Sequence, residues 1–535
     1  MKTLRPNYLL CAALLALPGA ATAQSPAPAT PNLEQRVREL EGLVRTLQAQ
    51  QAATQPVVIQ PGATPAVYAT QPATVSPPAA ASVSELLSDS TSAPLSGGNA
   101  GTGGSTAGGP GIGGATYSGP SPSSRPQEAV PFGLPEGQVA GWNNGFFIQS
   151  PDREYIFRLT GQIQTDYRGF TNSRDTTDID QFLLRRARFG LEANIAQYYE
   201  FRFLPDFAQG KTTIQDCYMN VHYWDELQFQ VGKFKQPVSY EQLIQDRYVP
   251  TMERSIIDQL VPARDIGVMV HGQNLVDQRF DYAFGVFNGE INGDGDTNQS
   301  PDIAARLALR PFAGDSMPIW LRYAQLGVSG TFGQENEPMS PTGLRTPDTV
   351  SFLAWNVGTR AYGTRTRLIP EYSYICGPFG FYAQYLTMDQ DILGGAAKAK
   401  VERVPFDGWV LFGSVLLTGE TRTSYNEQLA PLVPLDVRKP FQCPGAWEFV
   451  VRMSQLHVGD QVFTPGANQL ADPTKYANQA TEFMVGFNWY WNAWVRVQFN
   501  AEHDHFNDPV LLGTTRPSGL LNNQNSLFTR LQIIF

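Results

Sequence analysis

The stretch QFLLRRARFGLEANI, residues 181–195, alternates apolar and polar side chains with a period of two. A β-strand has this period when its two faces meet different surroundings. On the apolar phase lie Leu183, Ala187, Phe189, Leu191 and Ala193. On the other phase lie Arg186, Arg188, Glu192 and Asn194. Arg185 shares the apolar phase, so we expect it near a rim, where its long side chain can reach water. The stretch predicts a sheet with an apolar outer face and a charged inner face.

The same alternation recurs from residue 142 to residue 535, in short segments such as RFDYAFGVFNG, AWEFVVRMS and LFTRLQIIF. A soluble β-sandwich would also alternate, but its inner face would not be charged. The outward set is rich in aromatic residues, as at a membrane interface, and includes Phe483, Phe487, Trp489 and Trp491. We therefore predict an all-β protein, a transmembrane antiparallel β-barrel of about 16 strands over residues 142–535. A closed barrel leaves no unpaired backbone in lipid.

Composition excludes several other classes. The formal net charge of −10 argues against a nucleic-acid partner, and no run of about 18 apolar residues follows the first 23 residues. Since no nucleophile elbow or phosphate-binding glycine loop occurs, we expect neither an enzyme nor a cofactor. His503 and His505 share a strand face and Asp294 and Asp296 imitate a calcium loop, but both patterns are incomplete, so no metal is expected. Apart from Cys11 in the first 23 residues, the chain has three cysteines, Cys217, Cys376 and Cys443, and this odd number allows one disulfide at most.

The first 130 residues differ from the rest in composition and in the pattern of apolar residues. Residues 1–23 have the layout of a cleaved secretory signal, with an apolar run before Ala21-Thr22-Ala23. Residues 32–50 carry apolar side chains at a 3.5-residue period, which predicts a short coiled-coil helix, although a single solvated helix is the alternative. Residues 51–130 are rich in Ala, Pro, Ser, Thr and Gly, which predicts a disordered linker.

Most strand arginines fall on the inward phase once the larger apolar residues are placed outward. If they faced lipid, each would cost about 2–4 kcal/mol at mid-bilayer, a cost that a water-filled lumen removes. Guanidinium groups lining a narrow channel lower the energy of an anion. The alternative is that these arginines pair with lumen acids such as Glu192, Glu482 and Glu502 and stiffen the wall.

Several stretches occur in the order found in one known family: LLRRARFGLEA, VGKFKQPVSYEQL, ARDIGVMVHG, GAWEFVVRMSQL and GFNWYWNAWVRVQFN. The barrel region resembles the phosphate-selective porins typified by porin O and porin P. The resemblance implies a trimeric outer-membrane channel that passes anions by passive diffusion, with phosphate or polyphosphate preferred. It also implies an in-folded constriction loop, for which residues 236–262 are the candidate.

The resemblance places the basic wall at Arg185, Arg186 and Arg188, followed by Lys233 and Lys235. The complete set that we predict to line the pore and bind anions is Arg186, Arg188, Arg202, Lys233, Lys235, Arg247, Arg254, Arg264, Arg306, Arg310, Arg365, Arg367, Arg452 and Arg496.

The expected location is the bacterial outer membrane, with outer-membrane lipid around a homotrimer and the N-terminal extension in the periplasm. Small anions would be the permeants. A second hypothesis treats the barrel as a structural anchor, with the helix at residues 32–50 bound to the cell wall or a periplasmic partner.

Deletion of residues 24–130 is expected to leave a barrel that still assembles, because the alternating strands all follow that region. The oligomeric state of the deleted and full mature chains can be compared by gel migration without heating. A barrel that forms but no longer makes a trimer would show that the helix helps to hold the subunits together.

Overall fold

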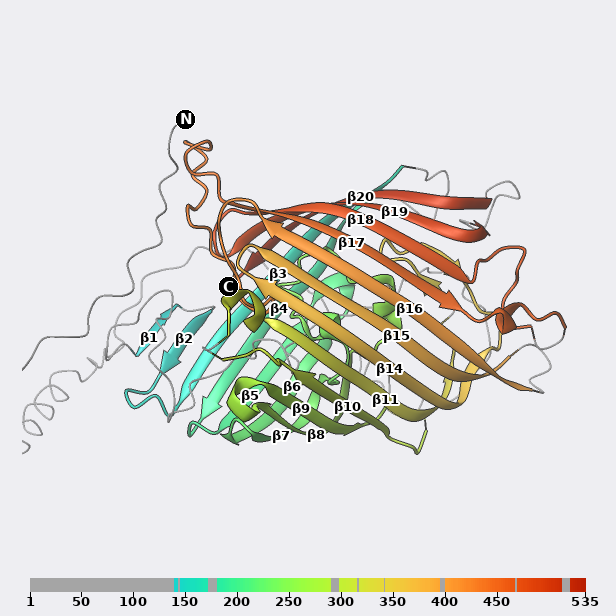
Figure 1. Ribbon diagram of the computed structural model, residues 1–535, viewed down its shortest axis with the longest axis horizontal. Coiled ribbons are helices and arrows are strands. Elements are labelled where there is room, and N and C mark those ends of the chain that lie inside the picture. The colour runs from blue at the N-terminus through green and yellow to red at the C-terminus, as the bar shows by residue number, and fades with distance from the viewer. Residues whose placement is uncertain are drawn as a thin grey trace, which may run out of the picture. The chain divides into compact units, whose positions relative to one another are not determined.

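The structure is a computed structural model that describes residues 139–142, 145–171, 180–289, 298–314, 317–340, 342–394, 400–466, 469–511 and 520–535. The predicted signal peptide, the coiled-coil segment at 32–50 and the linker at 51–130 lie outside these residues. The described residues from β3 onward form a closed antiparallel barrel of 16 strands (Figure 1). The predicted fold class and strand number are confirmed.

Each barrel strand pairs with the next along the chain, and β20 closes the ring by pairing with β3. The strands are β3 (Ile156–Phe170), β4 (Gln181–Ile195), β5 (Tyr199–Asp206), β6 (Thr213–Trp224), β7 (Leu227–Lys235), β8 (Arg264–Asn274), β9 (Phe280–Phe287), β10 (Asp302–Leu309), β11 (Ala324–Pro338), β14 (Arg360–Cys376), β15 (Phe379–Leu393), β16 (Val401–Leu416), β17 (Ala446–Val458), β18 (Gln479–Tyr490), β19 (Val495–Leu511) and β20 (Leu520–Ile534).

Short elements accompany the barrel. Strand β1 (Ala140–Trp142) pairs with β2 (Phe146–Gln149), which pairs with the start of β3, while β12 (Leu344–Arg345) and β13 (Ser351–Leu353) form a separate hairpin. The helices are η1 (Ala208–Gly210), α2 (Tyr240–Leu243), η2 (Ile256–Leu260), α3 (Leu275–Gln278), α4 (Ile319–Arg322) and η3 (Asp460–Phe463). Within the described ranges, no helix has the length and apolarity needed to cross a membrane.

The two faces of the strands follow the predicted alternation. In β10, Ile303, Leu307 and Leu309 are 42%, 48% and 43% exposed on the outside, whereas Asp302 and Arg306 are buried on the inside. Outward aromatic rings also contact across strands, as in the stacked Trp447 and Trp489, whose centroids are 5.1 Å apart. The barrel therefore presents an apolar outer wall and a charged inner wall.

Strand β4 breaks this alternation at one residue. Gln164 of β3 pairs with Arg186, but the next residue, Thr165, pairs with Leu184, so Arg185 is the extra residue of a β-bulge. Arg185 and Arg186 both turn inward and are buried, while Phe182 and Leu184 are exposed on the outer face. The prediction that Arg185 lies outward near the rim, and that Leu183 shares the lipid-facing phase, is wrong because the bulge shifts the phase.

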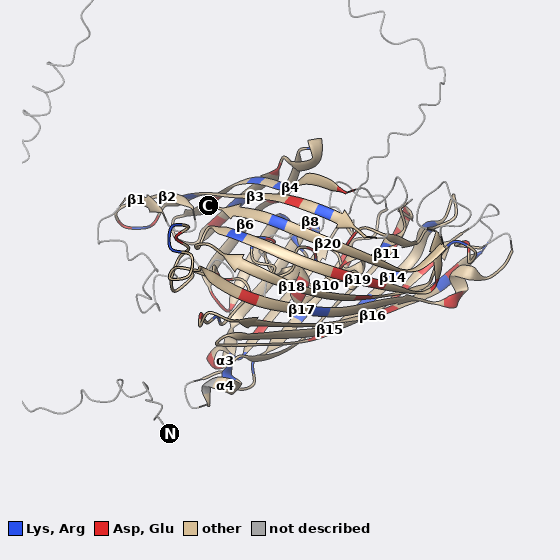
Figure 2. Cartoon of the chain, turned by 90° about the horizontal axis from the view of Figure 1, so that it is seen from above, with Lys and Arg blue, Asp and Glu red and all other residues tan. Residues whose placement is uncertain are grey.

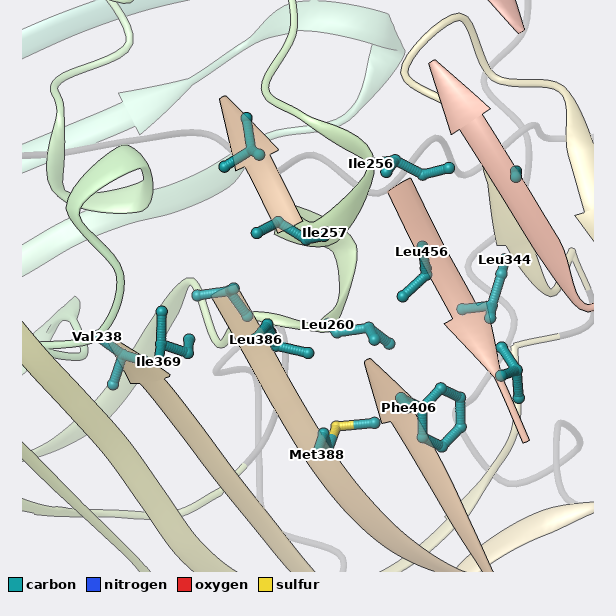
Figure 3. Close-up of a cluster of buried hydrophobic side chains, with 14 of the residues drawn as sticks. Val238, Ile256, Ile257, Leu260, Leu344, Ile369, Leu386, Met388, Phe406 and Leu456 are labelled. Atoms are coloured by element: carbon teal, nitrogen blue, oxygen red, sulfur yellow. The ribbon is translucent and has the colours of Figure 1, made fainter. Parts of the chain in front are cut away.

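The connection between β7 and β8, residues 236–263, folds into the barrel and is called the inner loop below. Its Val238, Ile256, Ile257 and Leu260 pack on inward side chains of β14, β15, β16 and β17 (Figure 3). The contacted wall residues include Ile369, Leu386, Met388, Phe406 and Leu456. The approach to β16 is close, since a Cβ at Gly408 would lie 2.6 Å from Cγ2 of Ile257. One part of the inner wall is therefore apolar and covered by protein.

A second long connection lies at the opposite end of the barrel. Most turns at that end are short, such as 225–226 and 377–378, and we call it the short-turn end. Residues 417–445 join β16 and β17 there and are called the β16–β17 segment. Its Tyr425 is buried against Tyr382 and Phe412, and the Asn426 side-chain oxygen accepts a 2.7 Å hydrogen bond from the Gln245 amide of the inner loop. The two segments therefore meet inside the barrel, which the sequence did not predict.

Leu368 lies at the middle of β14 on the outer face, next to the inward Arg367. We expect Leu368→Arg to destabilise the barrel by about 2–4 kcal/mol, because an arginine would then face lipid at mid-bilayer. The free energy of unfolding from lipid vesicles measures this effect, with Leu368→Met as the control. A loss below about 0.5 kcal/mol, the range of an ordinary surface substitution, would mean that this face does not meet lipid.

Candidate functional site

Thirteen of the fourteen predicted pore-lining residues project into the barrel interior or belong to the inner loop. The strand arginines Arg186, Arg188, Arg202, Arg306, Arg365, Arg367, Arg452 and Arg496 are buried on the inward face. Lys235 and Arg264 are buried at the ends of β7 and β8, Arg247 and Arg254 are buried in the inner loop, and Arg310 is partly exposed after β10. Basic and acidic residues share the barrel strands (Figure 2).

Lys233 is the exception. It pairs in register with Ile266, whose side chain is 43% exposed on the outer face. Directly paired residues of antiparallel strands project from the same face of a sheet. Lys233 therefore takes the outward phase, and the prediction that it lines the pore is wrong. The alternation of inward and outward side chains along β7 ends after Lys233, because both Phe234 and Lys235 are buried where β7 leads into the inner loop.

Glu253 of the inner loop is held by three wall arginines. Its carboxylate accepts hydrogen bonds from Arg185 at 2.8 and 3.1 Å, from Arg168 at 2.7 Å and from Arg530 at 3.1 Å. Burial alone would raise the pKa of the Glu253 carboxyl, but the charges of Arg185, Arg168 and Arg530 outweigh it and hold that pKa well below its ordinary value. This group fixes the loop to β3, β4 and β20.

Asp246 of the inner loop is the centre of a second group. Its carboxylate pairs with Arg188, lies 3.5 Å from the Nε of Arg186 and lies 3.0 Å from an Nη of Arg254. Burial opposes its ionisation, yet the surrounding cations hold the pKa of Asp246 well below its ordinary value. Two loop carboxylates thus lie against the arginine-rich part of the wall.

Other cations bind the loop backbone. Lys235 donates to the carbonyl oxygens of Gln242 and Ile244, and Arg254 donates to the Glu241 and Ile244 carbonyls at 3.1 and 2.7 Å. Arg452 donates to the Glu253 carbonyl at 2.6 Å. The contacts of Lys235 and Arg254 satisfy carbonyl groups at the end of the short helix α2, and Arg452 binds a carbonyl further along the inner loop.

Most remaining inward arginines pair with acids, as the alternative in the sequence analysis described. The pairs are Arg202 with Glu192 at 2.7 Å, Arg264 with Asp216 at 2.6 Å, Arg306 with Glu371 at 3.0 Å, Arg310 with Asp281 at 2.6 Å, Arg365 with Asp302 at 2.9 Å and Arg452 with Glu482 at 3.0 Å. Each of these cations is neutralised locally and stiffens the wall.

Three predicted arginines differ from this pattern. Within the described ranges, no carboxylate oxygen lies within 4.0 Å of the guanidinium groups of Arg247, Arg367 or Arg496. Arg367 donates to the Leu260 carbonyl and the Thr331 hydroxyl, and Arg496 donates to Gln532 at 3.1 Å. Arg247 lies 6.0 Å from the ring centroid of Tyr248. These three inward cations have neutral partners.

Arg247 and Arg496 line the same pocket at the short-turn end of the barrel. Arg247, Arg496 and Arg422 line about 360 Å³ of space that is continuous with open solvent, together with Tyr248, Tyr490, Trp494 and one acid, Glu427. Arg422 comes from the β16–β17 segment and pairs with Glu448 at 3.1 Å. The pocket therefore joins the inner loop, the β16–β17 segment and the starts and ends of β18, β19 and β20.

His503 and His505 do not form a metal site with their acidic neighbours. They lie on the outer face and hydrogen-bond to Asn525 and Asn523, whereas Glu502 and Asp504 take the inward phase. No cluster of His, Cys, Asp and Glu suited to a metal ion occurs in the part of the chain that the structure describes, and its three cysteines form no disulfide.

Comparison with known proteins identifies the family. The model of the phosphate-selective porin O and P family matches residues 157–535, which is more than half of the chain. The chain belongs to this family. This porin is 24% identical over 383 residues to Porin O of Pseudomonas aeruginosa, a match that spans 66% of this chain and 84% of Porin O. The family is one of outer-membrane porin channels.

Two solved structures illustrate the structural likeness. The anion-selective porin from Comamonas acidovorans is 11% identical with a TM-score of 0.42, over 71% of this porin and 100% of that chain. The outer-membrane channel DcaP of Acinetobacter baumannii is 8% identical with a TM-score of 0.44, over 72% of this porin and 99% of that chain. The family assignment rests on the sequence match.

Replacement of Glu253 by Gln is expected to destabilise this porin by about 3–5 kcal/mol, because it leaves Arg168, Arg185 and Arg530 buried without their common counter-ion. The free energy of unfolding measures the loss. The control is Glu402→Gln, which breaks an exposed pair with Lys400 and should cost about 0–1 kcal/mol. Equal losses for the two variants would contradict an anchoring role for Glu253.

Proposed function

We propose that this porin is a water-filled, passive diffusion channel that favours anions. The observation that carries the proposal is the presence of inward guanidinium groups at Arg247, Arg367 and Arg496 with no carboxylate beside them among the described residues. A cation whose charge is not cancelled locally attracts anions and repels cations in a narrow aqueous passage. The paired arginines contribute much less, because each is matched by a neighbouring acid.

The chemistry of the pocket at the short-turn end supports oxyanions as permeants. Arginine presents a planar set of donors that matches two oxygens of a phosphate or carboxylate. Arg247 and Arg496 lie in one pocket with the Tyr490 hydroxyl, to which Arg496 donates at 3.4 Å. We propose that a phosphate-like or polyphosphate-like anion contacts this pocket as it passes through the short-turn end of the barrel.

The proposal includes an orientation and an assembly. Outer-membrane barrels have short turns on the periplasmic side, so the short-turn end is assigned to the periplasm. The chain reaches the barrel there through β1 and β2, which supports a periplasmic location for the N-terminal extension. A homotrimer is proposed from membership of the family, and contact of the predicted helix at 32–50 with the cell wall stays a second proposal.

Substitution of Arg247 or Arg496 by Gln is expected to lower the permeability ratio of anion to cation about fivefold, which corresponds to the ~1 kcal/mol of a unit charge about 4 Å away in water. The ratio comes from the reversal potential of planar bilayers under a potassium chloride gradient. Arg438→Gln is the control, because Arg438 is highly exposed in the β16–β17 segment and outside the pocket.

Three outcomes contradict the proposal. Cation preference in the wild-type channel would contradict the proposed anion preference. Unchanged ratios of anion to cation permeability in both variants would mean that Arg247 and Arg496 have only a structural role. Absence of conductance would instead favour the barrel as an anchor.

A further inference from the structure

A turn in the second half of the β16–β17 segment carries apolar side chains on its surface. Residues 435–444 form this turn, called the 435–444 turn below, and within it Val437 is 77% exposed and Phe441 is completely exposed. The backbone of the turn is closed on itself, because the Asp436 amide donates to the Cys443 carbonyl at 3.1 Å. A defined conformation therefore directs two apolar side chains away from the rest of the protein.

Both ends of the turn are attached to residues beside the outer face of the barrel, at its short-turn end. The Leu435 amide donates to the Trp491 carbonyl at 2.7 Å, and the Trp489 indole donates to the Pro444 carbonyl at 2.7 Å. Trp489 stacks on Trp447 with 5.1 Å between ring centroids, and it contacts Trp491 edge to face at 5.4 Å. The turn thus lies next to three indole rings that contact one another.

Tryptophan rings on the outer wall of a barrel mark the depth of the membrane surface. They gather where lipid head groups meet the hydrocarbon, because the ring is apolar and its N–H is polar. The hydrogen bonds to Trp489 and Trp491 hold the 435–444 turn at the same level. In Figure 1, the orange connection that contains the turn extends past the edge of the barrel wall. Val437 and Phe441 therefore lie within reach of lipid hydrocarbon.

The turn also carries a positive charge. It contains one acid, Asp436, and two cations, Arg438 and Lys439, which gives a net charge of +1. Arg438 pairs with Asp436 at 2.9 Å, so the charge that remains is that of Lys439. Exposed apolar side chains beside a cation are typical of a segment that lies in the surface of an anionic membrane.

We propose that the 435–444 turn binds the membrane surface at the short-turn end of the barrel. Val437 and Phe441 enter the outer part of the hydrocarbon, and Lys439 contacts the phosphate of an anionic phospholipid. The partner is lipid rather than a second copy of this chain, because the turn continues the row of indole rings on the outer wall. The first half of the same segment packs inside the barrel through Tyr425, so one connection joins the lumen to the lipid surface.

A spin label on the turn can locate it in vesicles of phosphatidylcholine and phosphatidylglycerol. The label is attached at Phe441→Cys, in a chain whose three cysteines beyond residue 23 are replaced by serine. Electron paramagnetic resonance then gives the ratio of its collisions with oxygen to those with a water-soluble nickel chelate. We expect this ratio to be several times that of Asp508→Cys, an exposed position at the opposite end of the barrel, and to approach that of Leu368→Cys on the outer wall.

A second measurement tests the preference for anionic lipid. A bimane fluorophore at Phe441→Cys is quenched by brominated phosphatidylglycerol or by brominated phosphatidylcholine at equal mole fraction. We expect about fivefold enrichment of the anionic lipid around the fluorophore, the factor that corresponds to about 1 kcal/mol for one basic side chain near an anionic surface. Lys439→Gln should remove this enrichment. Lys475→Gln, which changes an exposed lysine in the connection between β17 and β18, should leave it unchanged.

Two positions of the spin label would overturn the inference. If the nickel chelate reaches the label at Phe441→Cys as readily as the label at Asp508→Cys, the turn lies in water. If neither oxygen nor the chelate reaches it, protein covers the turn, as a second copy of this chain would. Val437→Cys carries the same label and the same two outcomes if Phe441→Cys does not assemble.

The charge and the proposed function are tested separately. Equal quenching by the two brominated lipids would overturn the contact between Lys439 and an anionic phospholipid. Anion preference is measured by the reversal potential and does not enter either experiment, so a channel without anion preference would overturn the proposed function and leave the lipid contact of the turn standing.

Discussion

The inner loop is held inside the barrel by ion pairs between its carboxylates and arginines of the wall. Glu253 and Asp246 are both buried, and a buried charge is tolerated only when partners compensate the water it has lost. Arg168, Arg185 and Arg530 on one side and Arg186 and Arg188 on the other supply that compensation. The opposite side of the loop packs through Ile257 and Leu260 on an apolar wall. The loop is therefore amphipathic, and its position requires an inner wall with two kinds of surface.

Much of this architecture could be predicted from alternation alone. Lipid and lumen impose a strict period of two, so β10 reveals both its faces in eight residues. The inward position of most arginines follows from the same rule. Arg185 could not be placed in this way, because a bulge depends on the register with β3, and the sequence of β4 does not contain that register. Lys233 was misplaced for a different reason, because its position was taken from the family resemblance, although the alternation along β7 puts it on the outward phase.

The apolar part of the inner wall is also visible in the sequence, but a rule that expects water inside the barrel and lipid outside does not detect it. In β15, Leu386 and Met388 lie on the inward phase while Tyr385 lies on the outward phase, so both faces of the strand are apolar. A strand with two apolar faces must be covered by protein on its inner side, which here is the inner loop. The β16–β17 segment left no such signal. Its composition is that of any long connection, and only the structure places it inside the barrel, through the packing of Tyr425 on Tyr382 and Phe412 and the contact of Asn426 with Gln245.

The pairing of charges connects stability to selectivity. The chain has a net charge of −10, yet selectivity depends on the local balance inside the lumen, where most arginines are matched by acids. An arginine that holds the loop or the wall in place attracts a passing anion only weakly, because a neighbouring carboxylate already neutralises its charge. Arg247, Arg367 and Arg496 have neutral partners, and we propose that for this reason they attract anions more strongly than the paired arginines do. The same residue type thus serves two purposes in one lumen, and the nearest carboxylate decides which.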